Sequence, residues 1–199
     1  VSAVVPVDIY ENIPDYEHLA YISEKYKLKL IQDAAESLGS YYITGKYKNK
    51  KAGTLAPIGC LSFNGNKIIT TGGGGMIITD NEEAASHMKY LTTQAKDDPV
   101  YYKHDEVGFN YRMTNVQAAL GVAQLEKLDE YVEKKRYIFN RYNEKLSNIK
   151  GLSLIKENER TYSNYWFFSL VVDKEKFGIN RDQLMTFLQE KKIQTRPIW

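Results

Sequence analysis

The sequence predicts an α/β protein built on a mostly parallel sheet with flanking helices. Strand-like apolar runs at residues 2–10 and 28–32 enclose a helical pattern that starts after Asp15. A strand, a helix and a strand within about thirty residues indicate a βαβ unit, which requires a right-handed crossover and parallel strands. Two further apolar runs, at residues 58–63 and 75–80, predict two more strands of the same sheet.

Helix start signals support this order of elements. Asp15 is suited to cap the first helix, and Pro6 restricts the first strand because proline belongs at a strand end or on an edge. The inward face of that helix is predicted to carry Leu19, Ile22 and Tyr26. Asp80 with Glu83 resembles a capping box, which predicts a second helix after the strand at 75–80.

The pattern changes after the second helix. Residues 94–112 are polar and aromatic without a period, which predicts a long loop, and long loops in compact proteins are often functional. Thr114 and Gln117 form a capping box that opens a long amphipathic helix, predicted to run to about residue 147. Beyond it, strands are expected at 152–155 and 165–172. A last helix is expected after Asn180, with Gln183 completing its capping box.

We therefore expect three parts: residues 1–113 in a large domain, 114–147 as a linking helix, and 148–199 in a small C-terminal α/β domain. The chain of 199 residues begins without methionine and stops abruptly, which suggests a piece of something longer.

Composition excludes several classes of function. With 27 basic and 25 acidic residues, the net charge of +2 and the lack of charge blocks give no support for binding nucleic acid or a membrane. Cys60 is the only cysteine, so no disulfide can form within the chain and a reducing cytoplasm is the expected compartment. No apolar stretch approaches the length of a membrane span.

Three motifs fail on their spacing. The run Gly72 to Gly75 lacks the third glycine of a dinucleotide fingerprint and is followed by a strand. Residues 39–46 resemble a phosphate-binding P-loop, but five residues separate the two glycines where the motif has four. Tyrosine follows the lysine where the motif has serine or threonine. The histidines lie far apart and lack ligand spacing, so no metal site is expected; they are His18, His87 and His104.

One set of polar residues remains. Asp33 directly follows the strand at 28–32, Ser62 lies at the end of the strand at 58–63, and Lys67 lies just past it. Ligands of open parallel sheets gather beyond the carboxyl ends of the strands. A lysine, an acid and a small hydroxyl residue there can describe a site for pyridoxal phosphate. On chemistry alone, an ordinary solvated surface remains the alternative.

Three segments in order resemble the sugar aminotransferases of the DegT/DnrJ/EryC1/StrS family: "IQDAAESLGS", "GCLSFNGNKIITTGGGGMIITD" and "HDEVGFNYRMTNVQAALGVAQLEKL". The nearest likeness is to the branch that makes 4-amino sugars on nucleotide carriers, as in bacillosamine or legionaminic acid synthesis. The resemblance runs from about Val5 to the end of the chain. It implies part of the type I fold of pyridoxal phosphate-dependent transferases, the one of aspartate aminotransferase. It also implies pyridoxal 5′-phosphate as the cofactor. The implied reaction transfers the amino group of L-glutamate to the 4-keto carbon of a keto-deoxy sugar that is linked to a nucleotide, with UDP as the expected nucleotide.

The resemblance also assigns residues. Lys67 is the lysine that forms the Schiff base with the cofactor, and Asp33 is the partner of the pyridine nitrogen. Ala35 is expected against the cofactor ring, and Ser62 at its phosphate. Glu36 stands near the ring hydroxyl, where the family often has glutamine or histidine.

The loop at 94–112 is expected to cross to a second subunit. Asn110 matches an asparagine that reaches the phosphate of the neighbouring subunit, which implies a homodimer with shared sites. Without the resemblance, Asn110 would be read as a loop residue that bonds its own backbone. His104 and Arg112 are candidates for contact with the substrate because they stand near this loop segment.

Two alternatives stay open: a sugar 3-aminotransferase on the same scaffold, and a catalytically silent domain that binds or regulates a partner. A dehydratase relative would replace the Schiff-base lysine with histidine, so Lys67 argues against it. The family is longer than this chain, and its first segment, with a phosphate-binding loop and an aromatic residue that stacks on the cofactor, has no counterpart here. The identity of the sugar, its nucleotide and its stereochemistry are not predicted.

Overall fold

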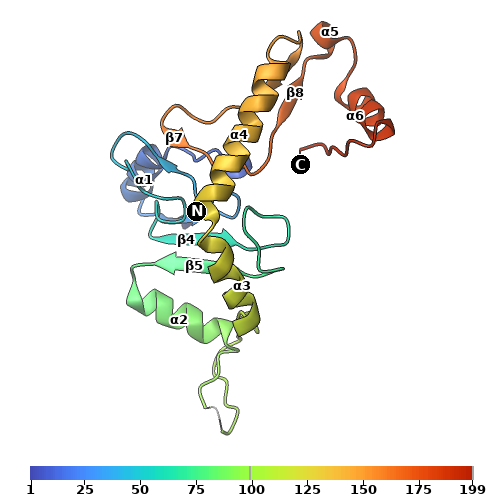
Figure 1. Cartoon of the computed structure of the whole chain (residues 1–199). Coiled ribbons are helices and arrows are strands. Elements are labelled where there is room, and N and C mark those ends of the chain that lie inside the picture. Colours follow the sequence, from blue (N-terminus) through green and yellow to red (C-terminus); the bar gives the residue numbers. More distant parts are fainter. Residues whose placement is uncertain (99, 199) are drawn as a thin grey trace.

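A four-stranded sheet organises the first half of the protein. The structure, a computed structural model, describes residues 1–98 and 100–198. The strands lie in the order β1 (Ala3–Val4), β2 (Lys29–Asp33), β4 (Ile58–Ser62) and β5 (Gly75–Thr79). β1, β2 and β4 are parallel and β5 is antiparallel to β4. The predicted α/β fold with a mostly parallel sheet is therefore confirmed (Figure 1).

The first strand is much shorter than the predicted run at 2–10. Pro6 has no N–H to give to a neighbouring strand, and its carbonyl oxygen accepts a bond of 3.0 Å from the backbone of Asp33. Val7 keeps one bridge to Asp33, and the short helix η1 (Ile9–Glu11) follows. Tyr10 in this helix has a φ of +48°, a left-handed conformation that extended strands do not contain.

Helix α1 (Tyr16–Lys25) makes the crossover from β1 to β2, as the sequence predicts. The Asp15 carboxylate caps it by accepting a bond of 3.1 Å from the backbone N–H of His18. Its fully buried aromatic residue is Tyr16, whereas Tyr26, which was predicted on the inward face, is exposed. Tyr26 follows the last helical turn, where the chain already turns toward β2.

Helix α2 (Glu82–Thr92) follows β5 and packs against it (Figure 1). The cap is Asn81, whose side chain accepts a bond of 2.8 Å from the backbone of Ala84, so the predicted cap Asp80 was one residue early. After α2, the described residues between 94 and 112 form neither helix nor strand beyond isolated bridges, and Pro99 lies outside the described residues.

The predicted long helix at 114–147 is divided into two. α3 (Asn115–Leu125) opens with the predicted capping box of Thr114, and α4 (Leu128–Leu146) follows after a bend (Figure 1). Lys127 between them has φ −106° and ψ 4°, which interrupts the helical backbone. No glycine or proline marks this break, so the hydrophobic period runs through it without a signal.

Two small two-stranded sheets stand beside the main sheet in the topology, and one of them joins the two halves of the chain. β3 (Tyr41–Tyr42) pairs with β7 (Thr161–Tyr162), and β6 (Leu152–Leu154) pairs with β8 (Leu170–Val172), both antiparallel. The predicted strand at 165–172 is wrong in its first part, because Tyr165 has a φ of +44°.

Two helices close the described chain: α5 (Lys174–Phe177) and α6 (Arg181–Glu190). α6 opens with the predicted capping box of Asn180 and Gln183. The division of the chain into a large domain, a linker and a small domain remains a prediction, and Trp199 of the last part lies outside the described residues.

The main core lies on the sheet and under α1. Its buried residues are Ile13, Tyr16, Leu30, Ala34, Tyr42, Ala52, Leu55, Leu61, Phe63 and Ile69. Beside it, Asp8 is completely buried and accepts bonds of 2.7 Å from the side chains of Gln32 and Ser37. Burial raises the pKa of Asp8 to about 6, although its three hydrogen bonds act against this change.

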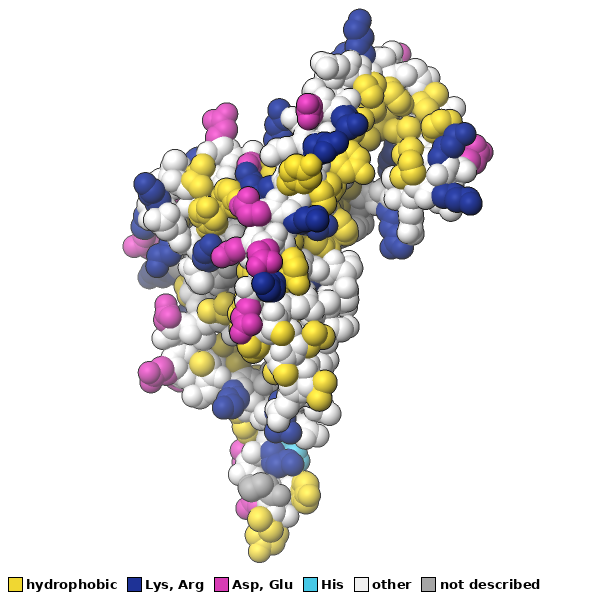
Figure 2. All heavy atoms as spheres, viewed as in Figure 1, with side chains coloured by type: hydrophobic (Ala, Val, Ile, Leu, Met, Phe, Trp, Pro, Cys, Tyr) yellow, Lys and Arg dark blue, Asp and Glu magenta, His cyan; other side chains and the backbone are white. Residues whose placement is uncertain are grey.

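Both signs of charge are interspersed on the surface, and apolar side chains gather toward the end of the molecule formed by β8 and α6 (Figure 2). Over the described ranges 1–98 and 100–198, no helix has the length and apolar character needed to cross a membrane.

Candidate functional site

The carboxyl ends of β2 and β4 lie side by side and carry polar residues. Asp33 ends β2 and is paired in parallel register with Cys60, two residues before Ser62 at the end of β4. Oδ1 of Asp33 accepts a bond of 3.1 Å from the backbone N–H of Ala35, which fixes the start of the following loop. The structure thus places Asp33, Ala35 and Ser62 at one edge of the sheet, where open α/β sheets bind ligands.

Lys67 lies in the loop that connects β4 to β5. Its backbone N–H donates to the carbonyl of Asn64 over 3.0 Å, and the loop closes where Phe63 donates to the carbonyl of Gly74 over 3.0 Å. Gly72 and Gly74 have φ values of +79° and +100°, which favour glycine. As predicted, the glycine run lets the chain turn back into the sheet after presenting Lys67.

The side chain of Lys67 points toward Glu36, which follows β2. Nζ lies 3.9 Å from Oε1 of Glu36, and the two side chains are only 13% and 9% exposed. The other carboxylate oxygen of Glu36 accepts a bond of 2.9 Å from the backbone of Tyr10. Lys67 is therefore largely enclosed and faces the loop that carries Ala35 and Glu36.

Trp166 completes these surroundings and was not foreseen. Its ring centroid lies 4.1 Å from Nζ of Lys67, and its Nε1–H donates to the carbonyl of Asn66 over 2.5 Å. The aromatic run at 165–172 had suggested an ordinary strand. The available signal was the indole N–H, which needs a partner when the ring is buried.

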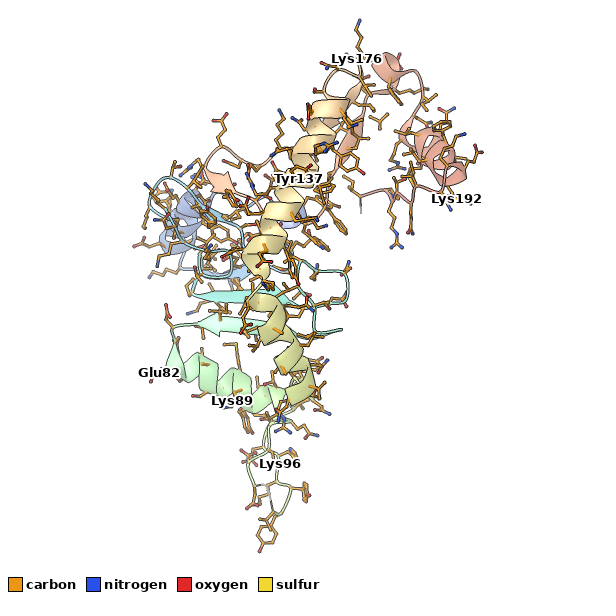
Figure 3. The ribbon with its side chains drawn as sticks, in the orientation of Figure 1. Glu82, Lys89, Lys96, Tyr137, Lys176 and Lys192 are labelled. Atoms are coloured by element: carbon orange, nitrogen blue, oxygen red, sulfur yellow. The ribbon has the colours of Figure 1, made fainter. Side chains whose placement is uncertain are left out.

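Three predicted residues lie elsewhere in the chain, on the loop that projects from the end of α2 and carries Lys96 (Figure 3). Asn110 is exposed and forms an isolated bridge with Thr93. Nδ1 of His104 lies 2.8 Å from the carbonyl oxygen of Gln94 in the same loop, and Arg112 is exposed. The structure therefore does not join these three to the contacts around Lys67 within this chain.

The side chains at the sheet edge fit pyridoxal phosphate chemically. The amine of Lys67 can form an imine with an aldehyde, the carboxylate of Asp33 can pair with a protonated ring nitrogen, and the hydroxyl of Ser62 can donate to a phosphate. Among the residues that the structure describes, no group of three histidine, cysteine, aspartate or glutamate side chains could hold a metal ion.

Comparison with known proteins gives one family over the whole chain. The DegT/DnrJ/EryC1/StrS aminotransferase family matches residues 1–199. EpsN of Bacillus subtilis is 40% identical over 198 residues, which are 100% of this chain and 49% of EpsN. GDP-perosamine synthase of Vibrio cholerae is 38% identical over 198 residues, covering 100% of this chain and 52% of the synthase.

A relative named for a UDP-linked sugar is more distant. UDP-4-amino-4,6-dideoxy-N-acetyl-beta-L-altrosamine transaminase of Campylobacter jejuni is 31% identical over 94% of this chain and 49% of its own length. Among solved structures, the aminotransferase TlmJ from Streptoalloteichus hindustanus matches with a TM-score of 0.89 at 25% identity, over 100% of this chain and 52% of TlmJ. The chain thus spans about half the length of the relatives it matches.

Proposed function

Because the chain belongs to the DegT/DnrJ/EryC1/StrS aminotransferase family, we propose that it is part of a pyridoxal phosphate-dependent aminotransferase for nucleotide-linked sugars. The amino donor in this proposal is L-glutamate, and the acceptor is the 4-keto carbon of a keto-deoxy sugar. The observation that carries the proposal is the placement of Lys67: its amine is enclosed beside Glu36, at the sheet edge that ends in Asp33 and Ser62.

Each of these residues has a role suited to its chemistry. Bound pyridoxal phosphate supplies an electron sink that stabilises negative charge at the carbon losing its proton. Asp33, at the end of β2, keeps the ring nitrogen protonated, because a carboxylate favours a nearby positive charge. Lys67 holds the cofactor and, once displaced by the amino donor, carries the proton between the two carbon atoms that exchange it.

The remaining predicted residues complete the proposed cofactor site. Ser62 donates to the phosphate, Ala35 lies against the ring, and Glu36 is near the ring hydroxyl. The 3.9 Å separation between Glu36 and Nζ of Lys67 supports the last assignment, since ring hydroxyl and lysine would share this side of the site. Enclosure of both side chains also limits water around the reacting amine.

The nucleotide is the least determined part of the substrate. The sequence pointed to a UDP-linked sugar, whereas the GDP-perosamine synthase is more similar, at 38% identity, than the UDP-sugar transaminase at 31%. We therefore propose a nucleotide-linked 4-keto-6-deoxy sugar as the acceptor class and treat UDP and GDP as two arms of one experiment.

We also propose a homodimer with shared sites. α3 exposes apolar side chains over much of its surface, with exposed fractions of 82% for Val116, 46% for Leu120, 59% for Val122 and 53% for Leu125. An exposed apolar helix of this kind is typical of an interface. Since α3 directly follows the projecting loop, pairing of this helix would direct Asn110, and with it His104 and Arg112, toward the partner's site.

The test uses the full-length protein with pyridoxal phosphate, L-glutamate and one keto sugar at a time. The expected result is a near-visible absorption band with the cofactor, and amino sugar from a UDP- or GDP-linked 4-keto sugar. Product from a 3-keto sugar alone would replace the 4-amino assignment with the 3-aminotransferase alternative. A protein that forms no band would favour the silent binding or regulatory domain.

A further inference from the structure

We propose that Trp166 is a positioning residue for Lys67, holding Nζ beside Glu36 through its indole ring and its bond to the lysine loop. The inference rests on the proposed role of Lys67 in binding the cofactor. It concerns a residue that lies far from Lys67 in the sequence and belongs to the C-terminal part of the chain.

Two separate contacts join Trp166 to the lysine loop. The ring centroid lies 4.1 Å from Nζ, within the range of an attractive cation–π contact. The indole Nε1–H donates to the carbonyl of Asn66, the residue directly before Lys67, over 2.5 Å. One side chain therefore contacts the charged end of Lys67 and also fixes the backbone from which Lys67 extends.

Trp166 is itself held from several directions. It is 3% exposed, its backbone N–H donates to Oδ1 of Asn164 over 2.9 Å, and its carbonyl accepts from Nζ of Lys135 over 3.0 Å. The Nδ2 amide of Asn164 donates to the carbonyl of Glu36 over 2.9 Å. The same buried asparagine thus fixes the backbone of both residues that contact Nζ.

The arrangement has a defined electrostatic consequence. The face of an indole ring is negative, and a carboxylate is negative, so Trp166 and Glu36 both favour positive charge at Nζ. The preference would act on the positively charged form of this nitrogen when it holds the cofactor. The ring also restricts the rotamers of the Lys67 side chain before the cofactor binds. Less conformational entropy of Lys67 is therefore lost when the cofactor is bound.

The experiment titrates the near-visible band of the full-length protein loaded with pyridoxal phosphate. In Trp166→Leu, the positive form of the nitrogen loses the ring face. The pH midpoint of the band should therefore move to lower pH by roughly half a unit. Trp166→Phe keeps a weaker ring face and should move the midpoint in the same direction by a smaller amount.

The matched control is Phe168→Leu. Phe168 lies in the same segment, but its ring centroid is 5.5 Å from Nζ of Lys135 and it contacts a different lysine. This variant disturbs the packing of the same segment and leaves the ring beside Lys67 in place, so the midpoint should stay unchanged. A shift of equal size in Phe168→Leu would reduce Trp166 to a packing role and overturn the proposal.

A second readout is the emission of Trp166, obtained as the difference between wild-type protein and Trp166→Phe. Reduction with borohydride should attach the cofactor to Lys67 and quench this emission strongly, since ring and Nζ are in contact. Absence of quenching, or an unchanged midpoint in both Trp166 variants, would overturn the proposal. If Trp166→Leu does not fold, the pH midpoint measured for Trp166→Phe is the test of the proposal.

The outcome stays distinct from that of the proposed function. A wild-type protein that forms no band contradicts the role of Lys67. A wild-type protein that forms the band, with Trp166 variants that behave like it, contradicts only the role of Trp166.

Discussion

Asp33 and Cys60 are paired across the parallel strands β2 and β4, and this register sets the two polar ends of the candidate site beside each other. Asp33 is the last residue of β2, and β4 continues for two residues beyond Cys60 to end at Ser62. A ligand at this edge of the sheet can therefore contact both Asp33 and Ser62. Backbone bonds between the strands place the main chain of Asp33, and the N–H of Ala35 holds its carboxylate at the strand end.

Asp33→Asn should abolish most of the aminotransferase activity while the protein still binds pyridoxal phosphate. A neutral amide cannot hold the ring nitrogen protonated, and loss of such a preorganised charge should lower kcat by about a hundredfold or more. Steady-state kinetics with L-glutamate and the keto sugar measure this. The control Asp182→Asn changes a surface acid on α6 and should keep full activity. Full activity in Asp33→Asn would remove Asp33 from the site.

Local patterns in the sequence were sufficient to predict most strands of the main sheet and the residues at which most helices begin. Thr114 and Asn180 cap α3 and α6 as predicted, because a capping box is a local pattern that needs no tertiary contact. The break at Lys127 and the left-handed Tyr165 were missed, because no glycine or proline stands at either position to mark it in the sequence.

In the candidate site, the residues at the strand ends were predictable from the sequence, but the burial of Lys67 beside Trp166 was not. Asp33 and Ser62 lie at the carboxyl edge because strands end there, which a periodic pattern can predict. The contact of Trp166 with Lys67 depends on the path of the chain after α4, which no short-range pattern encodes. The role of Asn110 at the site of a neighbouring subunit, and the substrate contacts of His104 and Arg112, stay predictions.

Stability should depend on pH through Asp8. Its folded pKa is raised from 3.8 to about 6, so the folded state binds the proton more tightly than the unfolded state. The stabilising contribution of the protonated form is complete below pH 3.8 and is lost as the pH rises through about 6. The loss should amount to roughly 2–3 kcal/mol of unfolding free energy.

Urea unfolding of wild-type protein and Asp8→Asn across this range measures that loss. Asparagine does not ionise, so the unfolding free energy of wild type should fall relative to that of the variant as the pH rises. A difference between the two proteins that stays constant with pH would contradict the role assigned to Asp8.

Thr114→Ala should lower the unfolding free energy by about 1 kcal/mol, because the backbone N–H of Gln117 then loses its side-chain acceptor at the start of α3. Thr114→Ser keeps the hydroxyl and should restore most of the loss. Denaturant unfolding followed by circular dichroism measures both variants. Equal losses in the serine and alanine variants would show that the threonine methyl group, and not the cap, is responsible.

Leu120→Glu should dissociate the proposed dimer, because it leaves an unpaired charge in an apolar interface on α3. Such a charge should weaken association by about tenfold or more. Sedimentation velocity over a concentration series measures this. Tyr137→Glu is the control, since Tyr137 is exposed and lies on α4 (Figure 3), whereas the proposed interface is on α3. A Leu120→Glu protein that remains dimeric would place the interface elsewhere.

The most direct test of the proposed chemistry is the absorption spectrum of the full-length protein with pyridoxal phosphate, compared with that of Lys67→Ala. The enclosed amine beside Glu36 should give wild-type protein a near-visible band, and reduction with borohydride should leave the cofactor attached to Lys67 in peptide mass spectra. The alanine variant should show neither. A band of equal strength in Lys67→Ala, or attachment at another lysine, would contradict the assignment of Lys67.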